Sequence, residues 1–570
     1  MRAKQNLTIL HTNDMHSHLQ GFHSDNYATK DGPYLKGGIA RISTKIKEIR
    51  KEKEPQSEPV LLLDSGDFMV GTLYELLTRR FSPEFTLMDI LKYDAVTLGN
   101  HEFEYSSRGL AKAIRVARTN IRGSTVPIVT SNIQLNFSGH TDGLRGLCEE
   151  GVIKPYLVKT LPNGIKVGII GLLGENAEEV AFSKGPIGVN HNKSFIQGIV
   201  DVVKNKGCHL IICLSHSGIA EDKELAHLIE GIDVIISGHD HKALSEPIKI
   251  KDTFIVEAGA YTKYLGELTL FINNGKLSLR RYQLIPINED IEEDIAVQRT
   301  VDEYTDLLDS KILNPIGLSF AKPIARTGFD LTKPSYGESN LGDLVADAMR
   351  TEIDLYQSEH LADFVFEATG FIGEDILGDD ERIITVSDVF QLLPLGIGPD
   401  EECGYPLVSF YLNAQEIKHI LEASVLLSSL GGRDYLLQVS GLRFWCHPQG
   451  EIFKKVRRME KWDFISQRYI PIDISDGTIL YKVGCNLQIA KFISQAIILK
   501  DFRGKPINIF TDVGKEKILV DANPHVNGVQ ELKQWRAFVH YLSSLPDLNG
   551  DSIPDIPDKY AIPQGRINLI

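Results

Sequence analysis

The sequence predicts a two-domain protein of class α/β followed by α+β. We expect a four-layer α/β/β/α domain over residues 1–289 and a smaller mixed α+β domain over residues 316–570. Three observations lead to this prediction. A chain of 570 residues is too long for one ordinary hydrophobic core. Strand-like runs alternate with helical stretches in the first half. An acidic stretch at 290–315 then separates the two halves.

The elements of the first domain follow from hydrophobic periodicity. Apolar runs of strand length occur at 7–10, 59–64, 94–98, 126–130, 165–172, 209–214, 233–237 and 253–257, and helical spacing occurs at 39–53, 83–92, 108–119, 193–205 and 219–230. Strands between helices predict stacked sheets covered by helices, with ligands bound at the carboxyl ends of the strands. Apolar residues at helical spacing in 290–315 predict a connecting helix, which Pro315 breaks.

Short polar clusters follow five of these strands. They contain, in chain order, Asp14 and His16, Asp67, Asn100 and His101, His216, and His239 and His241. One such cluster is common by chance. Five of them, each at the end of a buried strand, indicate a metal site and predict a hydrolase.

These side chains can supply the ligands of two divalent ions about 3.5–4 Å apart. Asp67 is expected to bridge the ions, because a carboxylate offers two oxygens. Asp14, His16 and His241 would complete one ion, and Asn100, His216 and His239 the other. Nitrogen and oxygen donors without a thiolate favour Zn, Mn, Fe or Co in a site of this kind over a structural zinc site ligated by cysteines. A water between the ions would become a hydroxide near neutral pH and attack phosphorus.

His101 lies next to a predicted ligand but is not needed as one. We expect its imidazole to be charged or to donate a hydrogen bond to the phosphoryl or leaving-group oxygen, which would stabilise the transition state. Glu104, three residues later, would orient the ring, as carboxylates often do for catalytic imidazoles. For any one of these histidines alone, the alternative is a structural residue with satisfied hydrogen bonds.

Longer motifs surround these clusters. The first half contains ILHTNDMHSHL, GGIARISTKI, LLLDSGDFMVGT, AVTLGNHEFEY, CLSHSG, ISGHDH and VEAGAYTKYLGEL, and the second half contains GESNLGDLVADAMR, ITVSDVFQLLPLG, LLQVSGLRF and LYKVGCN. In this order they resemble the 5′-nucleotidase family of calcineurin-like metallophosphoesterases, which includes UDP-sugar hydrolases and cyclic-nucleotide phosphodiesterases. The resemblance implies the same seven metal ligands, His101 as the catalytic histidine, and a second domain that binds the substrate.

Several positions depart from the family's pattern. Glu104 stands where the family usually has Asp, and segment 368–373 replaces one that carries a substrate-binding arginine. The phenylalanine expected after Leu-Pro is Leu395, and the glycine-rich aromatic run expected after Asn486 is absent. Two residues of the second domain are predicted to contact substrate, Phe371 and Arg350. The alternative for Arg350 is a solvated cation at a helix end.

The leading functional hypothesis is metal-dependent hydrolysis of nucleotide phosphomonoesters. The altered substrate-binding segments motivate an alternative, in which the same chemistry acts on a cyclic nucleotide, a nucleotide-sugar or a non-nucleotide phosphoester. A binding protein without activity is a third hypothesis, against which the complete ligand set and His101 argue.

A separate cation site is predicted near the end of the chain. Oxygen-bearing residues occur at positions 1, 3, 5, 9 and 12 of an acidic loop, namely Asp547, Asn549, Asp551, Asp555 and Asp558. This spacing is typical of calcium loops, but the glycine is at position 4 and the last residue is Asp rather than Glu. The alternative to a structural calcium ion is a turn rich in Pro, Asp and Gly.

Composition limits the partners. A net charge of −15 argues against a nucleic-acid polymer and leaves a small phosphoester, expected to be a nucleotide, as the partner. The basic run at 454–461 is interpreted as a solvated surface, with polymer or membrane contact as the alternative. No apolar run is long enough to span a membrane. Without a visible signal peptide we expect a cytoplasmic protein, or a periplasmic or secreted one if an upstream start exists. The oligomeric state is left open.

Overall fold

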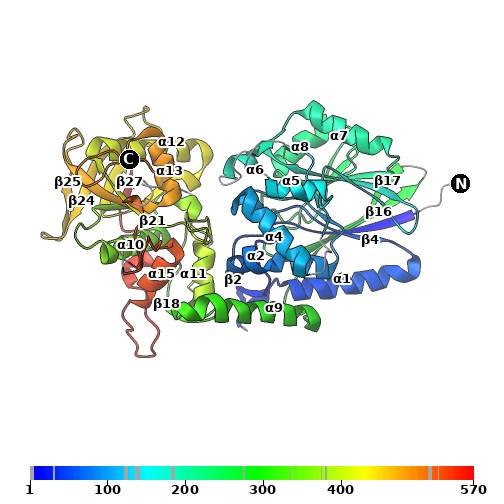
Figure 1. Ribbon diagram of the computed structural model, residues 1–570, viewed down its shortest axis with the longest axis horizontal. Coiled ribbons are helices and arrows are strands. Elements are labelled where there is room, and N and C mark those ends of the chain that lie inside the picture. The colour runs from blue at the N-terminus through cyan, green and yellow to red at the C-terminus, as the bar shows by residue number, and fades with distance from the viewer. Residues whose placement is uncertain are drawn as a thin grey trace. The chain divides into compact units, whose positions relative to one another are not determined.

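The computed structural model describes residues 5–29, 32–120, 126–134, 142–181, 187–273, 276–333, 336–373, 375–378, 382–510, 517–523 and 525–570. The chain divides into two compact units, Met1–Ile316 and Gly317–Ile570 (Figure 1). The first is an α/β unit and the second a mixed α+β unit, as the sequence predicts.

Two sheets form the middle of the first unit. The seven-stranded sheet has the order β17-β16-β1-β4-β5-β6-β8, and the six-stranded sheet has the order β14-β15-β13-β12-β10-β9. The strands of the first sheet are β1 (Gln5–Thr12), β4 (Val60–Asp64), β5 (Ala95–Val96), β6 (Ile128–Val129), β8 (Ile153–Lys154), β16 (Tyr264–Asn273) and β17 (Lys276–Pro286). Those of the second are β9 (Leu157–Thr160), β10 (Lys166–Leu173), β12 (Leu210–His216), β13 (Val234–Ser237), β14 (Ile248–Ile250) and β15 (Thr253–Val256). Short pairs are formed by β2 (Phe22–Thr29) with β3 (Gly32–Lys36), and by β7 (Ile133–Gln134) with β11 (Gly188–Val189).

The parallel strands determine where the polar clusters lie. In the first sheet β1, β4 and β5 run parallel, and in the second β10, β12, β13 and β15 run parallel. The carboxyl ends of each set therefore meet at one edge of their sheet. Apolar side chains between the sheets join the two sets into one core, in which Leu7, Ile9, Ile212 and Leu214 are fully buried. Burying each such side chain contributes about 1.5–3 kcal/mol.

Helices cover both outer faces of this pair of sheets. They are α1 (Ile39–Lys53), α2 (Glu75–Phe81), α3 (Pro83–Leu91), α4 (Ser106–Asn120), α5 (Asp142–Glu149), α6 (Glu175–Val180), α7 (Lys193–Asn205) and α8 (Ile219–Leu228). Figure 1 shows α7 and α8 on one side of the strands and α1, α2 and α4 on the other. Ile196, Val200 and Leu225 fasten α7 and α8 to the six-stranded sheet. Four layers result.

The stretch predicted as a connecting helix forms α9 (Ile295–Leu308), followed by a π-helical turn (Asp309–Leu313) and a 3-10 turn (Asn314–Ile316). Asp294 caps α9 by accepting a hydrogen bond from the Ala296 N–H at 3.2 Å. The same carboxylate accepts from the Ser43 hydroxyl of α1 at 2.6 Å, which fastens α9 to the first unit.

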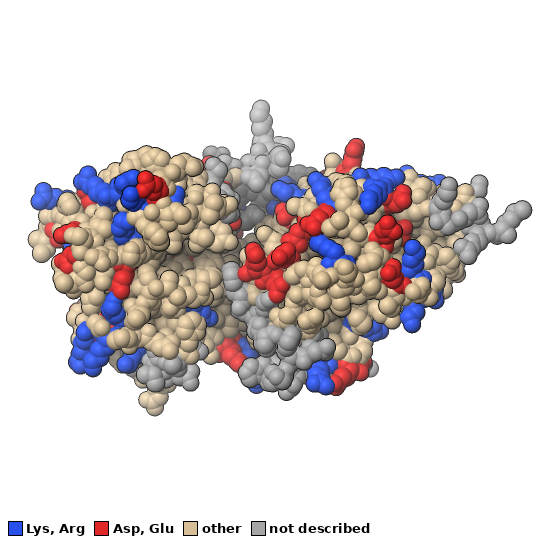
Figure 2. Space-filling model, turned by 90° about the horizontal axis from the view of Figure 1, so that it is seen from above, with Lys and Arg blue, Asp and Glu red and all other residues tan. Residues whose placement is uncertain are grey.

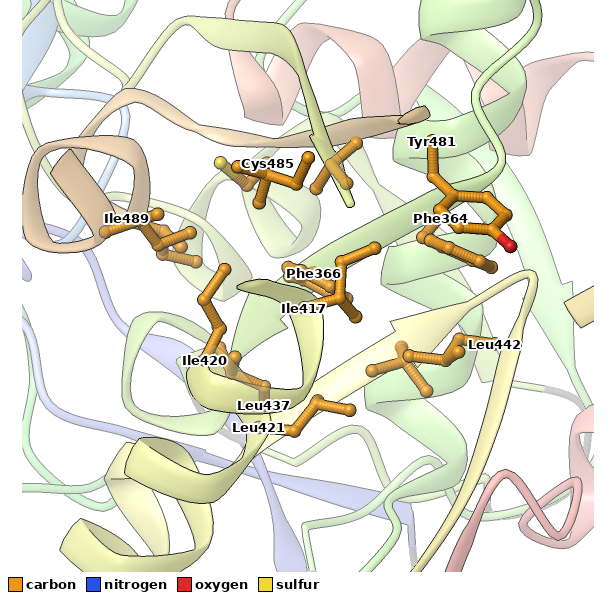
Figure 3. Close-up of a cluster of buried hydrophobic side chains, with 14 of the residues drawn as sticks. Phe364, Phe366, Ile417, Ile420, Leu421, Leu437, Leu442, Tyr481, Cys485 and Ile489 are labelled. Carbon is orange, nitrogen blue, oxygen red and sulfur yellow. The ribbon is translucent and has the colours of Figure 1, made fainter. Parts of the chain in front are cut away.

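The second unit contains two four-stranded sheets, ordered β21-β26-β19-β22 and β25-β24-β23-β27, and the pair β18-β20. Its strands are β18 (Pro323–Thr327), β19 (Phe364–Ala368), β20 (Arg382–Thr385), β21 (Leu407–Asn413), β22 (Leu437–Ser440), β23 (Leu442–Cys446), β24 (Val456–Asp463), β25 (Arg468–Pro471), β26 (Leu480–Asn486) and β27 (Ile567–Leu569). Its helices are α10 (Asn340–Tyr356), α11 (Val386–Leu392), α12 (Ala414–Gly431), α13 (Leu487–Ala496) and α15 (Gln534–Ser543). In the core of this unit Phe366 of β19 lies next to Ile417 of α12, and Phe364 of β19 lies next to Tyr481 of β26 (Figure 3).

The basic run of the second unit lies on and beside β24. Lys454 pairs with Glu451 at 2.6 Å, Lys461 lies 3.8 Å from Asp363, and Arg458 pairs with Glu460. These pairs within the unit favour the interpretation as a solvated surface. Figure 2 likewise shows acidic and basic side chains interspersed on the visible face. None of the helices in the described part of the chain is long and apolar enough to cross a bilayer.

Candidate metal centre

The predicted ligands gather into two groups at the carboxyl ends of the parallel strands. Asp14, His16 and His241 form the first group, and Asp67, His216 and His239 form the second, with ligand atoms within 4.8 Å of one another in each. Asn100 joins the second group, because its Oδ1 lies 3.2 Å from His216 Nε2 and 3.1 Å from His239 Nδ1. The structure therefore brings together all seven residues in the two sets expected from the sequence.

The loops that carry these residues have an unusual backbone. Five of the seven have positive φ, namely Asp14 (49°), His16 (47°), Asp67 (53°), His239 (84°) and His241 (57°). Residues with a Cβ rarely adopt this conformation, and each instance costs on the order of 1–3 kcal/mol. Strain of this kind collects at functional sites, because the surrounding structure must hold it in place.

Backbone carbonyls orient two of the four imidazoles. His16 Nδ1 lies 2.9 Å from the Val70 carbonyl, and His216 Nδ1 lies 2.9 Å from the Ser65 carbonyl. Since a carbonyl only accepts, each Nδ1 carries a proton, so Nε2 is the nitrogen that is available to coordinate a cation. His239 has the opposite arrangement, with Nε2 at 2.9 Å from Asn176 Oδ1 and Nδ1 toward Asn100.

A buried glutamate supports the loop of Asp67. Glu102 accepts hydrogen bonds from the backbone N–H groups of Asp67 (2.9 Å), Met69 (3.0 Å) and Gly99 (2.7 Å), which ties the loops after β4 and β5 together. A side chain at Gly99 would overlap the Asp67 carboxylate. Burial raises the pKa of Glu102 to about 7, while its N–H partners act in the opposite direction.

Asn13 performs a similar task for the first group. Its amide donates to Asp14 Oδ2 at 2.7 Å, and its carbonyl oxygen accepts from the Ala258 N–H at 2.7 Å. Glu257, in the same segment, accepts from the Lys242 N–H at 2.6 Å, next to His241. These contacts connect the loop after β1 with the segments around β15.

The donor set suits divalent cations. Burial raises the pKa of Asp14 to about 7, and burial lowers the pKa of His239 and His241 to about 4. These two imidazoles are therefore neutral at neutral pH, the form that coordinates a cation. His16 Nε2 and His241 Nε2 face each other at 3.1 Å, and a cation between them would use both lone pairs.

His101 lies beside both groups. Its ring is 5.1 Å from that of His16, and its backbone N–H donates to Asp67 Oδ1 at 2.8 Å. Its Nδ1 faces Glu104 Oε1 at 3.6 Å, an ion-pair distance beyond normal hydrogen-bond length. Burial lowers the pKa of His101, but the charges of Asp67 and Glu104 outweigh burial and raise it to about 9.

The two predicted substrate residues of the second unit take part in its packing. Arg350 is partly buried, donates from Nε to the Ala362 carbonyl at 2.9 Å and lies 4.8 Å from the Phe464 ring centroid. It is therefore not a fully solvated cation. The Phe371 ring meets that of Tyr405 at 5.7 Å in an edge-to-face arrangement. Contact of either residue with substrate stays a prediction.

The acidic loop near the C-terminus uses its carboxylates locally. Asp547 accepts from the N–H groups of Gly550 (2.7 Å) and Ser552 (2.8 Å), Asp555 accepts from the Leu548 N–H (2.7 Å), and Asp551 pairs with Arg326. Within the described ranges, the acidic residues of this loop do not form a group of ligand atoms like the two above. The geometry matches the turn alternative, and a calcium ion stays a prediction.

Sequence reasoning missed the residues that hold the ligands. Glu102, Asn13, Asn176 and Glu257 all hydrogen-bond to a ligand or to a ligand's loop. Glu102 and Asn13 are direct neighbours of predicted residues, which is the only signal the sequence offers for them. Asn176 is separated from His239 by 63 positions.

Comparisons with known proteins agree with this geometry. The calcineurin-like phosphoesterase family matches residues 7–243, and the 5′-nucleotidase C-terminal domain family matches residues 315–475. A 5′-nucleotidase of Rattus norvegicus is 31% identical over 368 residues, which cover 60% of this chain and 59% of that protein. A snake venom 5′-nucleotidase of Naja atra is 29% identical over 462 residues, which cover 77% of this chain and 81% of that protein.

Solved structures show the same fold. The crystal structure of a 5′-nucleotidase precursor from Thermus thermophilus matches with a TM-score of 0.73 and 24% identity, over 99% of each chain. The chain spans 59% of the length of the rat and human relatives that it matches. These findings confirm the resemblance predicted from the motifs.

Proposed function

Since the chain carries a calcineurin-like phosphoesterase domain followed by a 5′-nucleotidase C-terminal domain, we propose that it is a metal-dependent hydrolase of nucleotide phosphomonoesters. One observation carries the proposal. Seven nitrogen and oxygen donors from five strand ends converge in two adjacent groups, without a thiolate among them. Two divalent ions bound there would supply the positive charge that polarises a phosphoryl group and activates water. Zn, Mn, Fe and Co fit this donor set.

Each ligand has an assigned role in the proposal. Asp14, His16 and His241 would hold one ion, and Asn100, His216 and His239 would hold the other. Asp67, which lies in the second group, would bridge to the first. The carbonyls at Val70 and Ser65 keep the Nδ1 protons of His16 and His216, so that Nε2 coordinates.

His101 acts on the substrate rather than on the ions. Its side chain is 22% exposed, so the ring is not fully enclosed. A proton on Nδ1 faces Glu104 at 3.6 Å, which leaves Nε2–H to donate to a phosphoryl or leaving-group oxygen. Glu104 is a positioning residue in this scheme, because it acts through the imidazole.

The altered segment 368–373 favours a second candidate within the same chemistry. It reads Ala-Thr-Gly-Phe-Ile-Gly and carries no cationic side chain. Its Phe371 ring already packs against Tyr405. A nucleotide-sugar, a cyclic nucleotide or a non-nucleotide phosphoester would need other contacts from this segment than a nucleoside monophosphate does.

A phosphate-release assay on the full chain, loaded with Mn or Zn, tests the proposal. The substrates are AMP, UMP, cyclic AMP, UDP-glucose and p-nitrophenyl phosphate. We expect AMP and UMP to be hydrolysed with the highest kcat/KM. Asp67→Asn should lose at least about 100-fold, because it weakens the ligand that would hold both ions and, with them, the electrostatic stabilisation of the transition state. The matched control is Asp252→Asn, an exposed aspartate. Turnover of AMP no better than that of the aryl phosphate would favour the second candidate, and no turnover of any ester would overturn the proposal.

A further inference from the structure

The segment between β15 and β16 contacts the metal centre without contributing a ligand. Tyr261 and Thr262 have positive φ, at 59° and 58°, and the Tyr261 N–H donates to the Asp14 carbonyl at 2.8 Å. The turn closes through the Lys263 N–H, which donates to the Ala260 carbonyl at 3.2 Å. Two consecutive residues with positive φ are unfavourable by themselves, so the contacts around this turn must hold it next to the ligand loop.

The paired glycines before α1 fit against this turn. The Gly38 N–H donates to Thr262 Oγ1 at 2.9 Å, and Thr262 Oγ1 donates to the His18 carbonyl at 3.2 Å. A Cβ at Gly37 would lie 2.6 Å from Thr262 Oγ1 and 2.9 Å from a Phe22 ring carbon. The motif at 37–38 therefore allows the turn and the Phe22 ring to approach each other closely.

A row of aromatic rings extends from the first ligand group along this turn. The Tyr261 ring centroid is 5.2 Å from that of His241 and 5.5 Å from that of His16. His18 continues the row, at 4.6 Å from Tyr261 and 4.9 Å from Phe22. This surface, formed by Phe22, His18 and Tyr261, borders the site on the side of His241.

An ammonium group ends this surface. Lys263 Nζ lies 4.8 Å from the Tyr261 ring centroid and 5.6 Å from that of Phe22. Because the Tyr261 ring contacts both Lys263 and His241, the ammonium is one aromatic ring away from the first ligand group. Among the described residues, no carboxylate lies within 4.0 Å of this ammonium, and Lys263 is partly exposed.

A second lysine stands nearby. Burial and the charge of Lys263 lower the pKa of Lys36, so the two ammonium groups repel each other. An ammonium that a second lysine repels, and that has no carboxylate partner among the described residues, favours the binding of an anion. The aromatic faces beneath Lys263 hold its side chain in a fixed direction, which reduces the entropy lost on binding.

We propose that Lys263 is a substrate-binding residue that contacts an anionic group of the phosphoester other than the one cleaved. In a phosphoester that carries a second phosphoryl group, one phosphoryl would occupy the two ligand groups and the other would lie at the Lys263 ammonium, which would lower the KM of that substrate. AMP and UMP, with a single phosphoryl group, make no use of this contact. This inference rests on the proposed function, because it takes the ligand groups as the place of the reacting phosphoryl. If the contact between Lys263 and the aromatic rings were purely structural, replacing Lys263 would affect the binding of anions with one and with two phosphoryl groups equally.

Calorimetric binding of two probes to the metal-loaded full chain tests this. The probes are inorganic phosphate and pyrophosphate, and the variants are Lys263→Met, Lys263→Arg and Lys249→Met. Lys249 is the matched control, because its Nζ also lies over an aromatic ring, that of Phe254 at 5.1 Å, and its strand β14 carries none of the seven ligands. We expect the wild type to bind pyrophosphate more tightly than phosphate.

Lys263→Met is expected to weaken pyrophosphate binding by about 10- to 100-fold, the worth of a hydrogen bond to a charged group, and to leave phosphate binding unchanged. Lys263→Arg should keep most of the pyrophosphate affinity, and Lys249→Met all of it. Equal losses for both probes, no loss for pyrophosphate, or a wild type without preference would overturn the inference.

Kinetics separate this inference from the proposed function. The ratio of kcat/KM for UDP-glucose to that for p-nitrophenyl phosphate should fall in Lys263→Met by the same factor, with the change mainly in KM. A wild type that hydrolyses no phosphoester would overturn the proposed function, while the two binding constants would still report whether Lys263 contacts the second phosphoryl.

Discussion

Replacing Glu102 by glutamine removes the brace between two ligand loops. The carboxylate is fully buried and accepts three backbone hydrogen bonds, from Asp67, Met69 and Gly99. A glutamine of the same shape offers one acceptor oxygen and an NH2 group. At least one of the three N–H groups therefore loses its partner, and the NH2 group meets another donor.

The cost follows from these contacts. A buried N–H without a partner costs about 1–3 kcal/mol, so Glu102→Gln should destabilise the two loops by about 2 kcal/mol or more. That energy corresponds to about 30-fold faster local opening. Because Glu102 positions the loop of the ligand Asp67, its loss should also lower metal affinity by about 10- to 100-fold.

Hydrogen exchange with mass spectrometry measures this directly. At pH 8, above the Glu102 pKa of about 7, peptides that cover residues 65–71 and 97–103 should exchange faster in Glu102→Gln, and chelator competition should show weaker metal binding. Glu230→Gln, an exposed glutamate of the same unit, is the control. Unchanged exchange in both peptides together with unchanged metal affinity would refute the reasoning.

Three further outcomes are expected. Asn176→Ala removes the partner of His239 Nε2 at 2.9 Å and should lower metal affinity by about 10-fold in chelator competition; an unchanged affinity would show that Asn176 does not orient the ring. Leu214→Ala empties a fully buried position between the sheets and should cost about 2–5 kcal/mol in urea unfolding followed by circular dichroism, unlike exposed Leu228→Ala. Burial raises the pKa of Glu367 from 4.5 to about 8. Its contribution to the free energy of unfolding is therefore fully present below pH 4.5 and is lost as the pH rises to about 8. Glu367→Gln should flatten this decline in the tryptophan-monitored stability of the second unit, and an equal slope would contradict it.

The fold was accessible from the sequence where periodicity is strong. The eight strands expected in the first unit all form, because each is an apolar run between sheets or beneath helices. The hairpin of β16 and β17 was not expected, although β16 pairs with β1 along Gln5–His11. β16 is buried along most of its length rather than on alternate residues, so it lacks the alternating pattern of a half-exposed strand. The Asn274-Gly275 pair in the sequence is a recognised hairpin signal.

The metal ligands were accessible for a different reason. Parallel strands bring their carboxyl ends together, so polar residues after five strands predict one site without knowledge of distances. What the sequence does not encode locally is the support of that site. The positive φ of Asp67 and the three N–H groups that meet at Glu102 depend on how two loops fold against each other, and no spacing rule describes that. The same holds for the Lys263 turn, whose neighbours come from residues 18–38.

Elemental analysis of the full-length protein tests the central claim most directly. After metal removal, reloading with excess Zn or Mn and exhaustive dialysis, the account expects two tightly bound divalent ions per chain, with fewer in Asp67→Asn. One ion or none per wild-type chain would contradict the two-group metal centre on which the proposed chemistry depends.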